Sequence, residues 1–208
     1  MKVGTCLNPL HTALAVFGCL LDYQTISAEM QDTDLVTLVE RIAGESLPVV
    51  EDPGILRPTE FIHQVLHERF PTRHSRHAPR IATDTSQKLP VRYGGTLRRY
   101  RERSLPMVQL RYIPLVFAGW CRYLLGVDDA GKTMPVSPDP LLPQLQPLLA
   151  DVTLGKPDTS PISCVPSCKT PISSVWTCMR QGWPKRWRTI SVPCWQGRER
   201  CVISCAGS

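Results

Sequence analysis

The chain has 208 residues, with 24 basic and 18 acidic side chains and a formal net charge of +6. The excess is concentrated in residues 158–208, which carry 7 basic and 2 acidic side chains, whereas residues 1–157 carry 17 and 16. The length fits one domain, and the almost neutral charge of residues 1–157 gives no electrostatic case for a nucleic-acid partner.

The first predicted element is a helix over residues 8–21. Asn8 suits the N-cap, and Pro9 suits the first helical position, where its missing N–H costs nothing. The apolar side chains that follow form a wide stripe, made of Leu10, Ala13, Leu14, Phe17, Leu20 and Leu21. This apolar run is about half of the roughly 20 residues that a bilayer requires, so no membrane partner is predicted. A signal peptide, and hence a small secreted or lipid-anchored protein, stays an alternative to a buried helix.

Five more helices are predicted in chain order, over residues 33–43, 59–70, 86–100, 107–125 and 141–149. They are separated by a Pro-rich connection, a basic loop and a turn-rich loop at residues 47–58, 71–79 and 126–140. Because no Val/Ile alternation of useful length occurs, residues 1–157 are predicted to be all-α. The 13 glycines include no G-x-G, so the Rossmann phosphate loop and the P-loop are both absent.

An amine, an amide and an imidazole lie close together near the start of the first helix, on Lys2, Asn8 and His11. A lysine whose pKa is lowered by burial or by a nearby positive helix end can take a hydroxyl proton. Amide and imidazole donors can hold the oxygen as it gains charge, so the three residues suit alcohol–ketone chemistry. Spacing alone leaves an alternative open, in which Asn8 is only a cap, His11 a first-turn residue and Lys2 an exposed terminus.

Four segments in order carry a family resemblance: KVGTCLNPLHTALAVFGCLL from residue 2, EFIHQVLHERF from residue 60, RIATDTSQKLPVR from residue 80 and AGWCRYLLGVDDAGK from residue 118. Together they resemble the C-terminal domain of the mannitol dehydrogenase family, which includes polyol dehydrogenases, fructuronate and tagaturonate reductases and mannonate oxidoreductases. The resemblance covers most of residues 1–157. It implies a helical domain of the 6-phosphogluconate-dehydrogenase-like type.

The resemblance also implies a set of functional residues. Lys2 would be the general base, assisted by Asn8 and His11, and Arg80 and Lys88 would be substrate-pocket cations. The family transfers a hydride between NAD(H) and a polyol or keto-sugar without a catalytic metal. A sugar acid is the favoured substrate here, because Arg80 and Lys88 could meet a carboxylate. Lys2 lies six residues before Asn8, one more than the family pattern.

The resemblance reaches only the second part of such an enzyme. In the family a Rossmann domain that binds NAD comes first, so residues 1–157 are expected to be an incomplete helical domain with negligible activity alone. A cytoplasmic location is expected. The alternative is a non-enzymatic helical module that docks on a separately encoded Rossmann partner.

Three further groups of polar residues have simpler explanations. Gln64 stands where the metalloprotease motif H-E-x-x-H needs a glutamate, so His63 and His67 are predicted to lie at a solvent-exposed helix edge. The pair Asp128-Asp129 precedes Ala-Gly and indicates a turn rather than a paired-carboxylate site. Both a solvated helix end and a binding patch fit the basic cluster of Arg98, Arg99, Arg101 and Arg103.

Residues 158–208 differ from the rest in composition. Residues 1–157 hold 23 leucines and 3 of the 9 cysteines, whereas residues 158–208 hold no Leu, Tyr, Phe or His but 6 Cys and 4 of the 5 Trp. The pairs Cys164-x3-Cys168 and Cys201-x3-Cys205 lack common zinc spacing and histidine partners, so no metal is predicted. Back-translation of residues 162–208, read two bases along, permits an amphipathic helical sequence that resembles the family's C-terminal end. The segment is therefore expected to be an out-of-frame, irregular and disordered tail.

Overall fold

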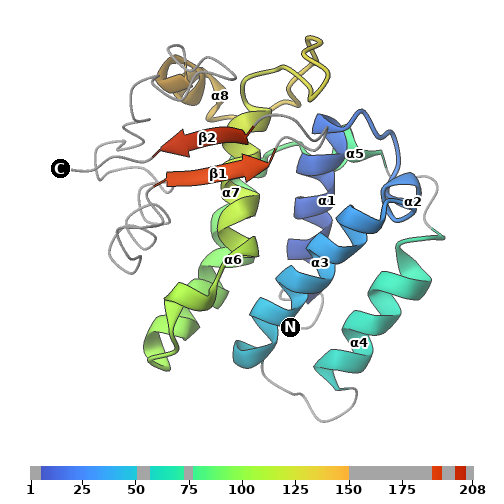
Figure 1. Cartoon of the computed structure of the whole chain (residues 1–208), viewed down its shortest axis with the longest axis vertical. Coiled ribbons are helices and arrows are strands. Elements are labelled where there is room, and N and C mark those ends of the chain that lie inside the picture. Colours follow the sequence, from blue (N-terminus) through green and yellow to red (C-terminus); the bar gives the residue numbers. More distant parts are fainter. Residues whose placement is uncertain (1–5, 51–56, 73–76, 150–188, 194–199, 205–208) are drawn as a thin grey trace.

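The computed structural model describes residues 6–50, 57–72, 77–149, 189–193 and 200–204. Figure 1 shows its longer helices gathered around α1 (Asn8–Leu20), which contacts α2 (Ile26–Glu29), α3 (Thr33–Ser46), α5 (Ala78–Ile81), α6 (Thr85–Glu102) and α7 (Tyr112–Tyr123). Every residue of α1 from Pro9 to Gly18 is buried. The apolar stripe of the sequence is thus one side of a helix that is buried all round, and α1 is the centre of the core.

The helices predicted from the sequence are present, with shifted ends. The predicted helix 59–70 divides into α4 (Pro58–Gln64) and a π-helical turn, η3 (Val65–Arg69), and the helix 107–125 into a 3-10 turn, η4 (Met107–Gln109), and α7. The segment 141–149 contains α8 (Leu142–Leu145) and η5 (Gln146–Leu149), and η2 (Leu47–Val49) follows α3. The four-residue α2, capped by the Thr25 hydroxyl, was not predicted, because it is too short to show a helical period.

The N-terminus of α7 receives its cap from α3. Within its own segment α7 has no side-chain cap. The Glu45 carboxylate accepts the backbone N–H groups of Arg111 at 2.5 Å and of Tyr112 and Ile113 at 2.8 Å. Burial raises the pKa of Glu45, and these three N–H groups oppose the shift. A half-buried carboxylate that satisfies three otherwise orphaned donors joins the two helices at one point.

Two glycines allow close approach to α1. A Cβ at Gly119 of α7 would lie 2.6 Å from Cζ of Phe17, and a Cβ at Gly18 would lie 2.1 Å from Oε1 of Glu29. Real Cβ atoms do not approach so closely, so only glycine lets α7 and α2 pack on α1 at these positions. By contrast, a Cβ at Gly94 or Gly95 of α6 would meet nothing within 4 Å.

The prediction of an all-α fold is confirmed for the described residues between 6 and 149, which contain helices and no named strand. Two short strands, β1 (Thr189–Pro193) and β2 (Arg200–Ser204), lie in the segment expected to be irregular. They pair antiparallel, with Thr189 opposite Ser204, and Figure 1 draws them beside α7. The run Thr189–Pro193 alternates polar and apolar residues, as a strand does, but no strand was predicted because the tail was expected to be out of frame. The domain boundary at 157 and the out-of-frame origin of the tail stay predictions.

Candidate active site

The first turn of α1 holds two of the three predicted catalytic residues. Asn8 is not the N-cap, contrary to the prediction: the cap is Leu7, which has helical dihedral angles and makes no side-chain cap hydrogen bond. The chain already turns helically at residues 6–7, so Asn8 is the first residue of α1 itself. His11 lies three residues further on, which places both side chains on one helix face.

The imidazole of His11 is packed against an aromatic ring. His11 is only 5% exposed, and its ring stacks on Phe70 with centroids 5.3 Å apart and planes inclined by 15°. Phe70 follows η3, and its backbone N–H donates to the carbonyl of Val65. Sequence analysis placed Phe70 only at the end of the predicted helix 59–70, because nothing local in the sequence links it to His11. Lys2 lies outside the described residues, so its place in this site stays a prediction.

Two consecutive residues of α6 hold the same turn from the other side. Nη1 of Arg92 donates to the carbonyl oxygen of Asn8 at 3.2 Å and to the hydroxyl of Thr12. The Tyr93 hydroxyl donates to the carbonyl of Pro9 at 2.6 Å, and Tyr93 is fully buried. Neither Arg92 nor Tyr93 was assigned to the site from the sequence. A signal for Arg92 was present, because it lies four residues after Lys88 in the segment 80–92 that carries the family resemblance.

Lys88 is half-buried at the corner between α5 and α6. Its Nζ donates to the carbonyls of Ile81, at 3.0 Å, and of Thr83. Burial lowers the pKa of Lys88, as does the charge of Arg92, and the carboxylates of Asp84 and Asp139 oppose both. The second predicted substrate cation, Arg80, is exposed at the end of α5. Lys88 thus lies one helical turn before Arg92 in α6, and Arg92 is the residue that reaches the turn of Asn8.

The corner is braced by the end of the turn-rich loop, at Pro138 and Asp139. The Asp139 carboxylate accepts the backbone N–H of Ser86 at 2.8 Å and also the hydroxyl of Ser86. The N–H of Asp84 donates to the carbonyl of Pro138 at 3.0 Å, and Asp84 has a left-handed φ of 54°. Fixed dihedral angles at this corner determine where the first turn of α6, with Lys88, begins.

The other polar groups are accounted for by the fold. His63 and His67 stack obliquely with ring centroids 4.4 Å apart, and His67, which is half exposed, lies 3.9 Å from Glu40. Asp128 accepts the N–H of Lys132 at 2.8 Å, and Asp129 lies 3.6 Å from the guanidinium of Arg122. The two histidines therefore lie at the helix edge, and the two aspartates belong to a turn, as predicted.

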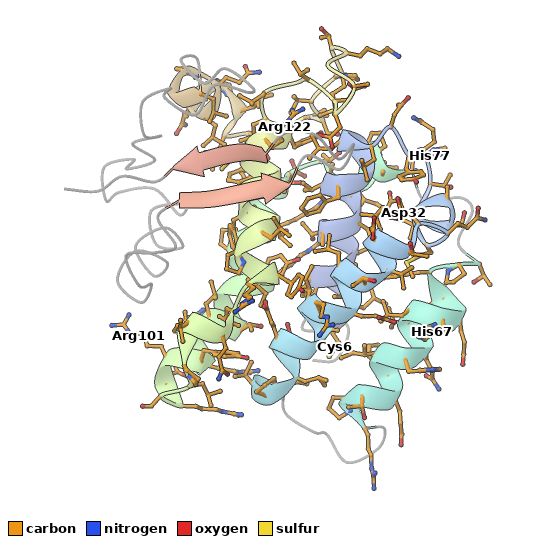
Figure 2. The ribbon with its side chains drawn as sticks, viewed as in Figure 1. Cys6, Asp32, His67, His77, Arg101 and Arg122 are labelled. Carbon is orange, nitrogen blue, oxygen red and sulfur yellow. The ribbon has the colours of Figure 1, made fainter. Side chains whose placement is uncertain are left out.

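The arginine cluster of α6 divides into two kinds of residue. Arg99 donates to the carbonyl of Val49 at 3.1 Å, and Arg103 to that of Pro48 at 2.8 Å, so both hold η2, the turn that follows α3. Arg98 is exposed, and Figure 2 shows Arg101 pointing away from the helices at the far end of α6. Half of the cluster is therefore structural.

The described residues contain no group of three side chains that could hold a metal ion. No helix in this part of the chain is long and apolar enough to cross a membrane.

The family model of the mannitol dehydrogenase C-terminal domain matches residues 1–157. The chain belongs to the mannitol dehydrogenase family. This confirms the resemblance inferred from the four segments, and it confirms that the match is to the C-terminal domain.

Curated relatives support the same family. The chain is 53% identical over 162 residues to a D-mannonate oxidoreductase of Thermotoga maritima, covering 77% of this chain and 30% of that protein. It is 32% identical over 149 residues to the D-mannonate oxidoreductase of Escherichia coli, covering 69% of this chain and 29% of the relative. It is 33% identical over 144 residues to a mannitol 2-dehydrogenase of Emericella nidulans, covering 67% and 27%. The chain thus spans less than a third of the length of these relatives.

Solved structures share the helical fold. The complex of Pseudomonas fluorescens mannitol 2-dehydrogenase with NAD and D-mannitol superposes with a TM-score of 0.65 at 25% identity, over 72% of this chain and 30% of that one. A D-sorbitol dehydrogenase in substrate-free form gives a TM-score of 0.67 at 21% identity, over 85% and 34%, which supports the fold alone. The helical C-terminal domain predicted from the sequence is therefore confirmed.

Proposed function

We propose that this chain forms the substrate-binding part of an NAD-dependent oxidoreductase that interconverts a polyol or an aldonate with its keto-sugar. The observation that supports this most directly is that Asn8 and His11 lie on the first turn of α1, to which Arg92, one helical turn after Lys88, donates. The family membership and the D-mannonate oxidoreductase at 53% identity point to the same reaction class.

In the proposed mechanism the side chains of this chain hold and deprotonate the alcohol. The Asn8 amide and the His11 imidazole donate to the substrate oxygen as it gains or loses charge. Lys2 accepts the hydroxyl proton, provided that its amine is neutral at the working pH. The stacking of His11 on Phe70 fixes the imidazole plane, so that little ordering remains when substrate binds.

The dinucleotide has to be held elsewhere. The chain contains no G-x-G sequence, and the chain spans 30% of the first relative's length. NAD(H), when bound, accepts or supplies the hydride. We therefore propose that this chain alone has negligible activity and that a dinucleotide-binding segment, in the same chain or separately encoded, completes it. A cytoplasmic location belongs to the same proposal.

A chimera tests the proposal. Residues 1–157 replace the matching part of the Thermotoga maritima D-mannonate oxidoreductase, and NAD-dependent oxidation of D-mannonate and D-mannitol is measured for the chimera and for the 208-residue chain. We expect turnover from the chimera only. Asn8→Ala and Lys2→Ala in the chimera should each lower kcat/KM by roughly 100-fold or more, since each removes a group acting on the reacting oxygen. Arg101→Gln, at an exposed position on α6, is the matched control.

Two results would count against the proposal in different ways. Turnover by the 208-residue chain would contradict its dependence on a second segment. Full activity of the Asn8→Ala chimera would contradict the assignment of the site.

A further inference from the structure

Arg92 is a cation of α6 that reaches the first turn of α1. Its Nη1 already holds the carbonyl of Asn8 at 3.2 Å and the hydroxyl of Thr12. A guanidinium has five N–H donors, so this clamp leaves the donors of Nε and Nη2 available on the other edge of the plane. The side chain is half-buried, so water can reach only some of the remaining N–H donors.

The charge of Arg92 is not compensated by an acid. None of the carboxylates that the structure describes forms an ion pair with it, and burial lowers its pKa, with only Tyr93 opposing. The buried Arg122 shows the contrary arrangement, since it lies 3.6 Å from Asp129 and also donates to two carbonyls. A desolvated cation without a counter-charge is costly, and an anionic ligand removes that cost.

Lys88 stands one helical turn before Arg92 on the same face of α6. Two of its three ammonium donors are used by the carbonyls of Ile81 and Thr83, which leaves one. The charge of Arg92 lowers the pKa of Lys88, in line with their spacing of four residues on one helix face. Like charges at this spacing destabilise a helix by themselves. Both features favour an anion that lies between the two side chains, beside Asn8.

We infer that Arg92, together with Lys88, binds the carboxylate of a sugar-acid substrate and so selects an aldonate over a neutral polyol. The planar guanidinium suits a carboxylate because it can donate two parallel hydrogen bonds to it. The acid end of the substrate then lies beside the first turn of α1, on which Asn8 and His11 lie. This inference rests on the proposed function and adds a specificity-determining residue to it.

A structural brace is the competing explanation, because Arg92 also holds Asn8 and Thr12. Three variants of the 208-residue chain separate the two roles. Arg92→Gln keeps a donor for the clamp but removes the charge, Arg92→Lys keeps the charge, and Arg98→Gln removes an exposed charge from the same helix. Circular dichroism and thermal unfolding report whether each variant is folded.

The measurement is a titration of the 15N-labelled chain with millimolar D-mannonate and with D-mannitol, followed by NMR. The signals are the side-chain amide of Asn8 and the Nε–H of Arg92. We expect D-mannonate to shift both signals, and Arg92→Gln to weaken its binding by about tenfold or more, as the loss of a charge-assisted pair implies. Arg92→Lys should weaken it less, and Arg98→Gln not at all. The affinity for D-mannitol should stay within about twofold in all three variants.

The outcomes distinguish this inference from the function on which it rests. If both sugars shift Asn8 and the Arg92 variants bind D-mannonate as the original chain does, the inference is wrong while the proposed function stands. If neither sugar shifts Asn8, the inference is wrong, because it requires binding by this chain, whereas turnover by the chimera still decides the proposed function. Should Arg92→Gln fail to fold, the original chain still decides the question, because an Arg92 Nε–H that D-mannonate leaves unshifted, or that D-mannitol shifts equally, overturns the inference.

Discussion

The carboxyl group of Glu29 lies against the backbone of Gly18, so closely that a Cβ on Gly18 would be 2.1 Å from Oε1. Glu29 is completely buried, and within the described part of the chain neither of its oxygens has a hydrogen-bond partner. Burial raises the pKa of Glu29 from 4.5 to about 9. A carboxyl that stays protonated at neutral pH explains how α1 and α2 pack around it.

This carboxyl gives stability a defined pH dependence. In the folded chain Glu29 keeps its proton up to about pH 9, whereas in the unfolded chain it loses the proton near pH 4.5. Between these two pH values the folded state binds one more proton than the unfolded state. The contribution of Glu29 to the free energy of unfolding therefore falls as pH rises, by at most about 1.4 kcal/mol per pH unit. Urea unfolding of the chain and of Glu29→Gln at pH 5.5 and 7.5 measures this fall in the free energy of unfolding. An equal pH slope in both proteins would contradict the prediction.

The contact between Gly119 and Phe17 gives a second prediction. Phe17 is 2% exposed, so its ring has no room to move away from an added methyl. Gly119→Ala should destabilise the fold by about 1–3 kcal/mol through overpacking. Gly94→Ala is the matched control: its Cβ meets nothing within 4 Å, so it should stabilise α6 by roughly 0.5–1 kcal/mol. Thermal unfolding measures both changes, and two changes of the same sign would contradict the packing argument.

The cap that Glu45 provides for α7 gives a third. Glu45→Ala leaves the N–H groups of Arg111, Tyr112 and Ile113 without this acceptor, so we expect a loss of about 1–3 kcal/mol in the free energy of unfolding. Glu40→Ala on the same helix removes a carboxylate that is about half exposed, and it should cost less than about 0.5 kcal/mol. Similar losses in the two variants would show that the cap contributes little.

The hydrogen bond from Tyr93 to α1 gives a fourth prediction. It concerns the stability of the first turn of α1 rather than of the whole fold. Tyr93→Phe removes the donor at 2.6 Å from the carbonyl of Pro9, at a cost of about 1–2 kcal/mol. Amide hydrogen exchange should quicken in the first turn of α1. In Tyr100→Phe, which loses a bond to the carbonyl of Glu45, it should quicken at the end of α3 instead. Uniform exchange changes in both variants would contradict a local role.

The fifth prediction concerns the origin of residues 158–208. If the frame is lost near residues 157–161, the DNA read two bases along should stay open and encode an amphipathic helical segment. Sequencing of the gene from several hundred bases upstream to the stop codon tests this. An early stop codon in the shifted frame would contradict the prediction of a frameshift.

Much of the fold was predictable because it depends on short-range rules. The four apolar residues that the helical period selects in α3, namely Leu35, Leu38, Val39 and Ile42, are all buried, and Ala43 and Ser46 are buried with them. The predicted start at Thr33 agrees with the cap, since Asp32 accepts the N–H groups of Asp34 and Leu35. The same rules wrongly predicted Asn8 as the N-cap of α1. Whether a residue is a cap depends on the conformation of the backbone before it, and the sequence pattern does not determine that conformation.

What the sequence by itself determined is the family, the all-α character of the described residues up to Leu149 and the candidate residues on α1. These follow from motifs and from a period of 3.6 residues, both of which are contained within a few turns of chain. Only the tertiary structure decided that Arg92 reaches Asn8 across 84 residues, that Phe70 stacks on His11 and that Glu45 caps α7. The physical reason is that such contacts depend on how the helices pack together, and each helix carries only one side of that contact in its own sequence.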